Sequence, residues 1–289
     1  MRYPSLTSFL EKSASALKRG PVAMIMVEDL VEVESTIRYH QLTGFKTTVV
    51  FAPTELELPM SLEDEIHRVD YDLARPCAVE EAVTAVSNAA PGVWMYYCYN
   101  AEYLFFPFCE TRNVTELLAF HTEERRDAML AYVIDLYADD LSRYPDAVSL
   151  DHAWLDKSGY YALGRPDPDN HNHPKERQLN FFGGLRWRFE EHVPQEKRKI
   201  DRIALFKSAE GLSLKGDHTF SDEEYNTYAC PWHNNLTAAI VSFRTAKALK
   251  LNAGSTYDIS TFKWHNSVPF EWTSQQLLDL GLMEPGQWF

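Results

Sequence analysis

Short apolar runs and stretches of helical periodicity alternate along the first hundred residues. Residues 22–27 and 46–53 form apolar runs of strand length, and between them Leu30, Val33 and Ile37 recur on one face of a helix. This pattern predicts a β-α-β unit, which has parallel strands and a right-handed crossover. Ligands of such sheets bind beyond the carboxyl ends of the strands, so the residues that follow each run are candidate binding residues.

Helix-start signals refine this pattern. Asp29 and Glu32 have the spacing of a capping box for the crossover helix, and Ser221 and Glu224 repeat that spacing further along. Residues 1–20 carry apolar positions at helical intervals and end in glycine, which predicts a packed leading helix. The other predicted elements are a helix start at 61–64, helices within 78–92, 113–141 (one or two, with Glu123 and Glu124 in the first turn of the second), 234–251 and 273–281, and strands at 94–107 and 200–207.

The stretch from 144 to 199 has weak periodicity and is rich in Pro, Gly, Asp, Asn and His. This composition predicts long loops and short strands that cover one face. The chain shows no internal repeat, low-complexity tract or interdomain linker. We therefore expect one α/β domain over 1–289, with a leading helix at 1–20 and two halves at 21–143 and 144–289.

Charge narrows the classes of partner. The 42 acidic and 28 basic residues give a formal charge of -14, which argues against binding a nucleic-acid backbone but leaves room for a small anionic ligand. No apolar run is long enough for a membrane span and no secretory leader is visible, so we expect a soluble cytoplasmic protein. The four cysteines lack a CxxC spacing and are expected to be reduced, packed thiols.

The strand predicted at 94–107 carries two polar residues near its middle, Asn100 and Glu102. If the strand continues through them, both side chains point the same way and offer oxygen ligands suited to Mg²⁺ or Mn²⁺. The alternative is a strand end whose polar groups satisfy the backbone of a turn.

Two later segments also carry candidate chemical groups. Asp217 and His218 are candidates for a general base or a metal ligand, although a histidine there is also compatible with a surface role. Residues 167–174 place Asp and His at alternate positions, which resembles a metal loop. Their prolines and asparagines favour a solvated turn instead.

Arginine and aspartate pairs complete the candidates. Arg186 and Arg188 follow a Gly-Gly turn and would project to one side of a strand, where they could clamp a diphosphate or a sugar carboxylate, although the neighbouring aromatics also suit a core. Asp135, Asp139 and Arg143 have the intervals of a charged helix face. The sequence has no GxSxG, Cys-His, P-loop or GxGxxG signature.

The order of these segments resembles the family 2-like glycosyltransferases of the GT-A fold. The resemblance rests on a first strand leading to Glu28, the helix ending IRYHQLTGF, the strand TTVVFAP and the tryptophan-led strand WMYYCYNAEYLFFP. It is best over 22–107 and extends more loosely through GGLRWR, RIALFK and the helix near Phe243. It implies a GT-A-like, Rossmann-type mixed sheet flanked by helices, with 21–143 as the nucleotide-binding half and a loop-rich acceptor-side half over 144–289.

The resemblance also implies a site. In the family an Asp-x-Asp motif holds a divalent metal against the diphosphate of a nucleotide sugar, and Asn100-Ala101-Glu102 stands at that place, or Tyr99 and Ala101 in the other register. An amide is a poorer ligand than a carboxylate, and His218 is a candidate compensating ligand. The sequence differs from the family pattern at two other places. Glu55 or Glu57 stands where the family has the acid that holds the nucleotide base, and Ser242-Phe243-Arg244 stands where relatives have an apolar-His-Phe-Lys motif.

Three functions compete. The first is a transferase that moves a sugar from a nucleotide-sugar donor, with Mn²⁺ or Mg²⁺, to a glycan or other hydroxyl acceptor, as in polysaccharide biosynthesis. The second is a GT-A-like domain without catalysis that binds a glycan or a protein. The third is a metal hydrolase at 167–174, whose ligand spacing fits no recognised set. For the transferase, the residues assigned to donor and metal are Glu28, Asn100, Glu102 and His218. Arg186, Arg188 or Lys207 would stabilise leaving charge, and Asp217 or His218 would lie near the acceptor.

Overall fold

The computed structural model describes residues 1–228 and 235–288. Within it the chain divides into two compact units, and each unit draws on separate stretches of the sequence. The first unit comprises Met1–Tyr103, Thr111–Met129 and Ile203–Asn226, and the second comprises Leu104–Glu110, Leu130–Arg202 and Thr227–Phe289. This division is interleaved along the chain and does not fall at residue 143.

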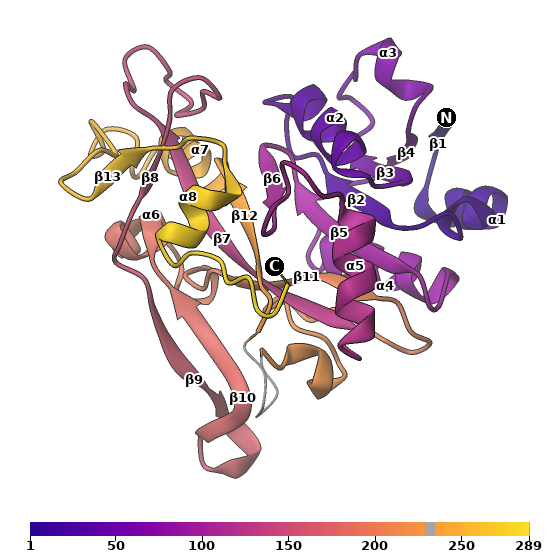
Figure 1. The fold of residues 1–289 in the computed structure, drawn as a ribbon. Coiled ribbons are helices and arrows are strands. Elements are labelled where there is room, and N and C mark those ends of the chain that lie inside the picture. The colour runs from indigo at the N-terminus through magenta and orange to yellow at the C-terminus, as the bar shows by residue number, and fades with distance from the viewer. Residues whose placement is uncertain (229–234, 289) are drawn as a thin grey trace. The chain divides into compact units, whose positions relative to one another are not determined.

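The first unit is a helix-flanked sheet of mostly parallel strands (Figure 1). Its strands follow the order β1-β4-β3-β2-β5-β11, in which only the last is antiparallel to its neighbour. The strands are β1 (Arg2–Tyr3), β2 (Val22–Met26), β3 (Thr47–Ala52), β4 (His67–Asp70), β5 (Trp94–Tyr99) and β11 (Asp201–Lys207), whose first two residues belong to the second unit. The helices are α1 (Leu6–Leu17), α2 (Val33–Thr43), α3 (Met60–Glu63), α4 (Ala78–Ala89), α5 (Val114–Glu123) and the 3₁₀ turn Glu223–Asn226.

Burial explains the apolar runs of this sheet. Every residue of β2 and β3 is buried, because helices cover both faces of a parallel sheet. Helix α2 leads from β2 to β3 and α4 leads from β4 back to β5, so right-handed crossovers place these two helices on opposite faces. The prediction of an α/β fold with a mixed sheet flanked by helices is confirmed, and the sheet is Rossmann-like.

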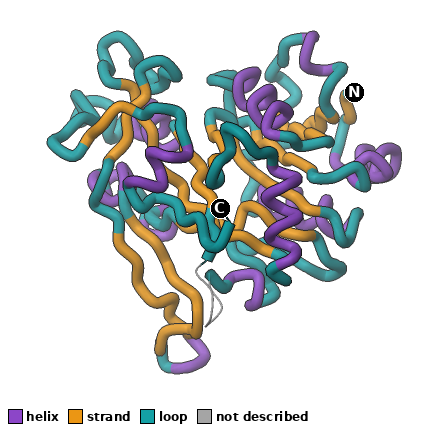
Figure 2. The backbone as a smooth tube through the Cα atoms, in the orientation of Figure 1, coloured by secondary structure: helices purple, strands orange, loops and turns teal. Residues whose placement is uncertain are grey.

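The second unit combines short strands with a long hairpin (Figure 2). Strand β12 is parallel to β7, β8 is antiparallel to β7, and β9 and β10 pair with each other. Its strands are β6 (Glu102–Phe105) and β7 (Ala128–Ala138), which both begin in the first unit, β8 (Ala153–Asp156), β9 (Tyr161–Asp167), β10 (His173–Phe182), β12 (Ala238–Ser242) and β13 (Ser267–Pro269). Its helices are α6 (Gly184–Arg188), α7 (Arg244–Leu251) and α8 (Ser274–Asp279), with 3₁₀ turns at Pro168–Asn170, Glu190–His192 and Gln195–Lys197.

Two predicted helices are wrong. Residues 128–138 form strand β7, in which all but one residue is buried, so Asp135 is a strand residue and not part of a charged helix face. Glu123 ends helix α5 and Glu124 is its C-cap, so neither begins a second helix. Residues 238–242 form β12, and only the part from Arg244 onward is helical; Asn234 lies outside the described residues.

Both capping boxes predicted from spacing are also wrong. Helix α2 begins at Val33, after Glu32 in a left-handed conformation, and Glu32 makes no side-chain cap. Ser221 accepts a hydrogen bond from the Ser213 amide instead of capping a helix. A capping box does occur at the start of α5, where Asn113 and Glu116 exchange the two bonds.

Three other predictions are confirmed. The leading helix is present, and the stretch from 144 to 199 consists mainly of loops and strands, although it also holds the short helix α6 and three 3₁₀ turns and its strand β10 has 10 residues. Residues 167–174 are the turn of the β9–β10 hairpin, with their side chains exposed or half-exposed.

Of the cysteines, Cys98 is buried and Cys77 is exposed, so Cys77 is not a packed thiol; Cys230 lies outside the described residues. Across the described part of the chain, no helix has the length and apolarity to cross a membrane.

Candidate functional site

The strand order of the first unit reverses between β2 and β5. Strand β3 lies on one side of β2 and β5 lies on the other, and the ends of β2 and β5 are level because Met26 pairs with Tyr99. In open α/β sheets, ligands bind beyond the carboxyl ends of the strands at such a switch point. Glu28, which is exposed, follows β2 at this point and Asn100 follows β5. The structure therefore brings these two predicted residues together.

Asn100 connects the two strand ends. Its side-chain oxygen accepts a hydrogen bond from the Glu28 amide at 2.9 Å, and its Nδ2 donates to Asp29 Oδ1 at 2.9 Å and to the Val31 carbonyl at 2.8 Å. The side chain is fully buried. Asn100 therefore fixes the loop that follows β2, and both amide hydrogens are used in doing so.

The chain turns at Ala101 and does not continue as a strand. Ala101 has φ 59°, and its amide donates to Thr36 Oγ1 at 2.9 Å. Glu102 Oε2 accepts from the Tyr99 amide at 2.9 Å, and Glu102 is fully buried. The expectation that Asn100 and Glu102 share one face of a continuing strand is wrong. Their bonds correspond to the alternative interpretation, in which polar side chains satisfy the backbone of a turn.

A buried histidine that the sequence did not single out lies on the α2 side of β5. His40 Nδ1 donates to the Thr36 carbonyl at 2.7 Å, its Nε2 lies 4.0 Å from Cys98 Sγ, and its ring stacks on Tyr96. Burial lowers the pKa of His40 to about 4, although the Thr36 carbonyl and Glu102 act in the opposite direction. His40 is therefore neutral at pH 7. The sequence feature that could have indicated its hydrogen bond is the four-residue interval from Thr36 to His40, which is one helical turn.

The start of α2 is acidic. Glu32 is its N-cap and Glu34 lies in its first turn, while the Val31 amide is already bonded to Asp29 Oδ1 at 2.9 Å. A helix N-terminus attracts phosphate only when its amides and its positive dipole are available. Here the acids oppose that attraction, so a diphosphate at this edge would need a separate positive charge.

Asp217 and His218 lie in a turn beside the opposite face of β5. The His218 ring stacks on Tyr97 with centroids 6.0 Å apart, and its Nδ1 is 3.1 Å from the Tyr97 hydroxyl. His218 has φ 64°, a conformation that costs energy for a residue with a side chain. Asp217 is exposed, and its Oδ1 accepts from the Thr219 hydroxyl at 2.6 Å. A half-buried imidazole next to an exposed carboxylate has the chemistry of a general base.

Lys207 is not brought to this edge. It pairs with Trp94, the first residue of β5, because β11 runs antiparallel to β5. Six strand residues separate the two ends of β5 by roughly 20 Å. The Lys207 ammonium lies 3.5 Å from Asp127 Oδ1, so it has a partner of its own. Lys207 therefore cannot share a site with Asn100 in this structure.

Arg186 and Arg188 belong to the second unit and lie on the short helix α6, so the prediction that they share a strand face is wrong. Arg188 Nη1 donates to both oxygens of the buried Asp156 at 3.1 Å, and its guanidinium lies 4.5 Å from the Trp264 ring centroid. Asp156 also accepts from the Tyr137 hydroxyl at 2.5 Å. The charge of Arg188 is thus balanced inside its own unit.

Arg186 pairs with a second buried carboxylate. Its Nε lies 3.6 Å from Asp135 Oδ1 and donates to Thr245 Oγ1 at 3.1 Å, and its Nη1 donates to the Lys199 carbonyl at 2.7 Å. Burial raises the pKa of Asp135, while Arg186 acts in the opposite direction. The Gly183-Gly184 turn lets α6 come this close to β7.

We expect Gly184→Ala to lower the free energy of unfolding by about 1 to 3 kcal/mol. Gly184 has φ +62°, and an added Cβ would lie 2.9 Å from Asp135 Oδ2. Gly211→Ala is the matched control, because Gly211 has φ +75° with nothing within 4 Å of an added Cβ. Urea unfolding measures both variants, and equal losses would show that the contact with Asp135 costs nothing.

Among the described residues, no group of three or more His, Cys, Asp and Glu side chains is arranged to hold a metal. The enclosed side chains of Asn100 and Glu102, bonded to backbone amides and a carbonyl, do not fit a metal in this arrangement. Compared with known proteins, the chain matches no family model and no curated protein.

Proposed function

We propose that the chain is a glycosyltransferase that binds a nucleotide-sugar donor at the carboxyl ends of β2 and β5. The observation that carries this proposal is the switch point, where Glu28 and Asp29 follow β2 and are tied to the end of β5 by Asn100. The parallel order β4-β3-β2-β5 is that of a mononucleotide-binding half sheet. The resemblance in segment order to GT-A enzymes supports the same assignment.

The residues proposed for this reaction have specific roles. Glu28 and Asp29 supply oxygen atoms of the type that Mn²⁺ or Mg²⁺ prefers, and such a cation would neutralise the leaving diphosphate. His218, or Asp217 beside it, takes the proton of the acceptor hydroxyl while that oxygen bonds to the anomeric carbon and the nucleoside diphosphate leaves. The charges of Arg186 and Arg188 are paired with the buried Asp135 and Asp156 inside the second unit, so no role at the donor site is proposed for them.

A second candidate is a GT-A-like domain that binds a glycan or a protein without catalysis. The hydrogen bonds of Asn100 and Glu102 favour it, because these side chains stabilise a turn at the place where the resembling enzymes hold metal. The two candidates differ in whether a nucleotide binds.

Titration calorimetry with UDP, GDP, CDP, ADP and dTDP, each with and without Mn²⁺, tests the proposal. We expect at least one to bind with a dissociation constant below about 1 mM, and Glu28→Gln to weaken it at least about tenfold. Lys207→Met is the control, because Lys207 lies at the other end of β5 and its loss should leave binding unchanged. If none of the five binds in either condition, the transferase proposal is overturned and the binding-module candidate replaces it.

A further inference from the structure

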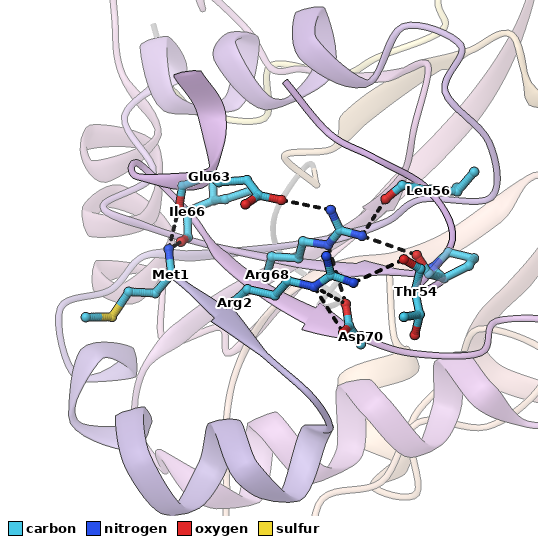
Figure 3. Close-up of polar contacts among 9 residues, drawn as sticks. Met1, Arg2, Thr54, Leu56, Glu63, Ile66, Arg68 and Asp70 are labelled. Carbon is cyan, nitrogen blue, oxygen red and sulfur yellow. Dashed lines mark hydrogen bonds and ion pairs between the residues drawn. The ribbon is translucent and has the colours of Figure 1, made fainter. Parts of the chain in front are cut away.

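Two arginines, one on the edge strand β1 and one on the neighbouring strand β4, reach the same loop (Figure 3). Arg2 on β1 and Arg68 on β4 are partners in the parallel register of these strands. Both side chains extend toward the loop that follows β3, Pro53 to Leu56, and both contact Asp70 at the carboxyl end of β4.

Arg68 is fully buried and contacts the loop at two points. Its Nη2 donates to the Pro53 carbonyl at 3.3 Å and also to the Leu56 carbonyl. Its Nη1 donates to Glu63 Oε1 at 2.9 Å, and its Nε lies 3.5 Å from Asp70 Oδ1. A buried guanidinium that loses these partners would be strongly destabilising, so the geometry of the loop is tied to the position of Arg68.

Arg2 supplies a third point of attachment. Its Nη2 donates to the Thr54 carbonyl at 3.1 Å, while its Nε donates to the two oxygens of Asp70 at 2.9 and 3.1 Å. The carbonyls of three loop residues are therefore held by arginine. We call Arg2 and Arg68 the arginine clamp.

The charges of the clamp are balanced locally. Its two guanidinium groups face the two carboxylates of Asp70 and Glu63. This balance leaves no net positive charge to attract a phosphate, and the guanidinium donors that face the loop are used on backbone carbonyls. The contacts therefore point to fixing a loop and not to binding an anion.

The loop lies where a nucleoside would be recognised. It follows β3, the strand next to β2, at the carboxyl edge that carries the switch point. In sheets of this type, the residue after the second strand of the half sheet contacts the ribose. Thr54 and Glu55 are exposed, so with the carbonyls held on one side their side chains are presented to solvent.

We propose that the arginine clamp is a positioning device that fixes the loop from Pro53 to Leu56 as the nucleoside-contacting wall of the donor site. This inference rests on the proposed function. The clamp acts on the nucleoside and not on the diphosphate, because Arg2 and Arg68 reach the ligand only through the loop.

The experiment compares wild type, Arg2→Met, Arg68→Lys and Arg38→Met in the full chain. Arg38 is the matched control, since it is a partly exposed arginine of the same unit paired with Glu34 and Glu65. The ligands are inorganic pyrophosphate and whichever of the five nucleoside diphosphates binds most tightly. Amide hydrogen exchange is followed over residues 54–56. We expect Arg2→Met to speed exchange in the loop and to weaken the nucleoside diphosphate about tenfold, with pyrophosphate binding unchanged. Arg68→Lys, which keeps the charge but cannot reach all its partners, should do the same.

Failure of each idea has its own signature. If wild type binds no nucleoside diphosphate, the proposed function fails and the inference fails with it. If wild type binds and Arg2→Met binds equally well, only the inference is overturned. It is also overturned if the variants weaken pyrophosphate as much as the nucleoside diphosphate, or if Arg38→Met has the same effect as Arg2→Met.

Discussion

Replacing Asn100 with aspartate is expected to lower the free energy of unfolding by about 3 to 5 kcal/mol at pH 7. The substitution places a carboxylate oxygen where Nδ2 now lies, 2.9 Å from Asp29 Oδ1 and 2.8 Å from the Val31 carbonyl. Two donated hydrogen bonds become two repulsions at a fully buried position. The aspartate typical of the resembling enzymes is therefore incompatible with the Asp29 of this chain.

The pH dependence of this loss has a defined sign. In the folded variant, repulsion between Asp29 and the introduced carboxylate raises the pKa of this pair of acids. The folded variant therefore binds a proton more readily than the unfolded one. The loss relative to wild type should therefore shrink as pH falls through the raised pKa, because a protonated carboxyl can donate again. Urea unfolding at pH 7 and pH 5 measures this change.

Two further variants test the cause. Asp29→Asn combined with Asn100→Asp exchanges acid and amide, and it should recover part of the loss in a double-mutant cycle. Asn88→Asp is the control, because Asn88 also donates to two carbonyls, of Thr84 and Leu212, but is exposed. A loss at Asn88 equal to that at Asn100, or no recovery in the double variant, would contradict this explanation.

Two buried histidines are expected to make the fold sensitive to acid. Burial is the largest cause that lowers the pKa of His40 and of His121 to about 4, against 6.5 for an unperturbed histidine. The unfolded chain therefore binds protons between pH 6.5 and 4 that the folded chain does not, and stability falls as pH falls through that window. The expected loss is about 3 kcal/mol per histidine, complete near pH 4 and absent above pH 7.

Near-isosteric amides remove the titration and keep the hydrogen bonds. His40→Asn retains a donor near Nδ1 for the Thr36 carbonyl, and His121→Gln retains one near Nε2 for the Ala128 carbonyl, which His121 now contacts at 2.8 Å. In each variant the difference from wild type should shift by about 3 kcal/mol in favour of the variant between pH 7 and pH 4. His171→Asn, at the exposed hairpin turn, is the control and should show no such shift. Parallel stability curves for wild type and variants would refute this account.

The central strands could be predicted from the sequence because burial on both faces leaves a direct trace. Residues 22–27 are apolar throughout and 46–53 are apolar from Val49 onward, both runs are of strand length, and β2 and β3 lie within one residue of these limits. The same trace is misleading at 128–138, where nearly complete burial makes helix and strand periods indistinguishable. Length alone favoured a helix there, and β7 is an unusually long strand.

The candidate site could be located but not described from the sequence. The polar position after β5 was identified, yet the turn at Ala101 depends on Thr36 and Asn100 depends on Asp29, about 65 to 70 residues away in the chain. The position of Lys207 could not be predicted, because the direction of β11 cannot be read from a mostly apolar run. Lys207 lies at the end of β5 opposite to Asn100. Arg68 was missed because a buried arginine looks like any surface arginine until its carbonyl partners are known.

Because the first unit is built from separate stretches of the chain, some of its strands are synthesised long before the strands they pair with. Strand β5 pairs with β11, but about 100 residues separate them, among them most of the second unit. At roughly 5 to 20 residues per second, a ribosome needs on the order of 5 to 20 s to make that interval. Throughout this time the emerging chain carries the aromatic strand β5 with one unpaired edge, which is a target for wrong pairing. The nascent chain is therefore most vulnerable to aggregation between the emergence of Tyr99 and that of Leu205, and a chaperone that shields strand edges would act in this interval.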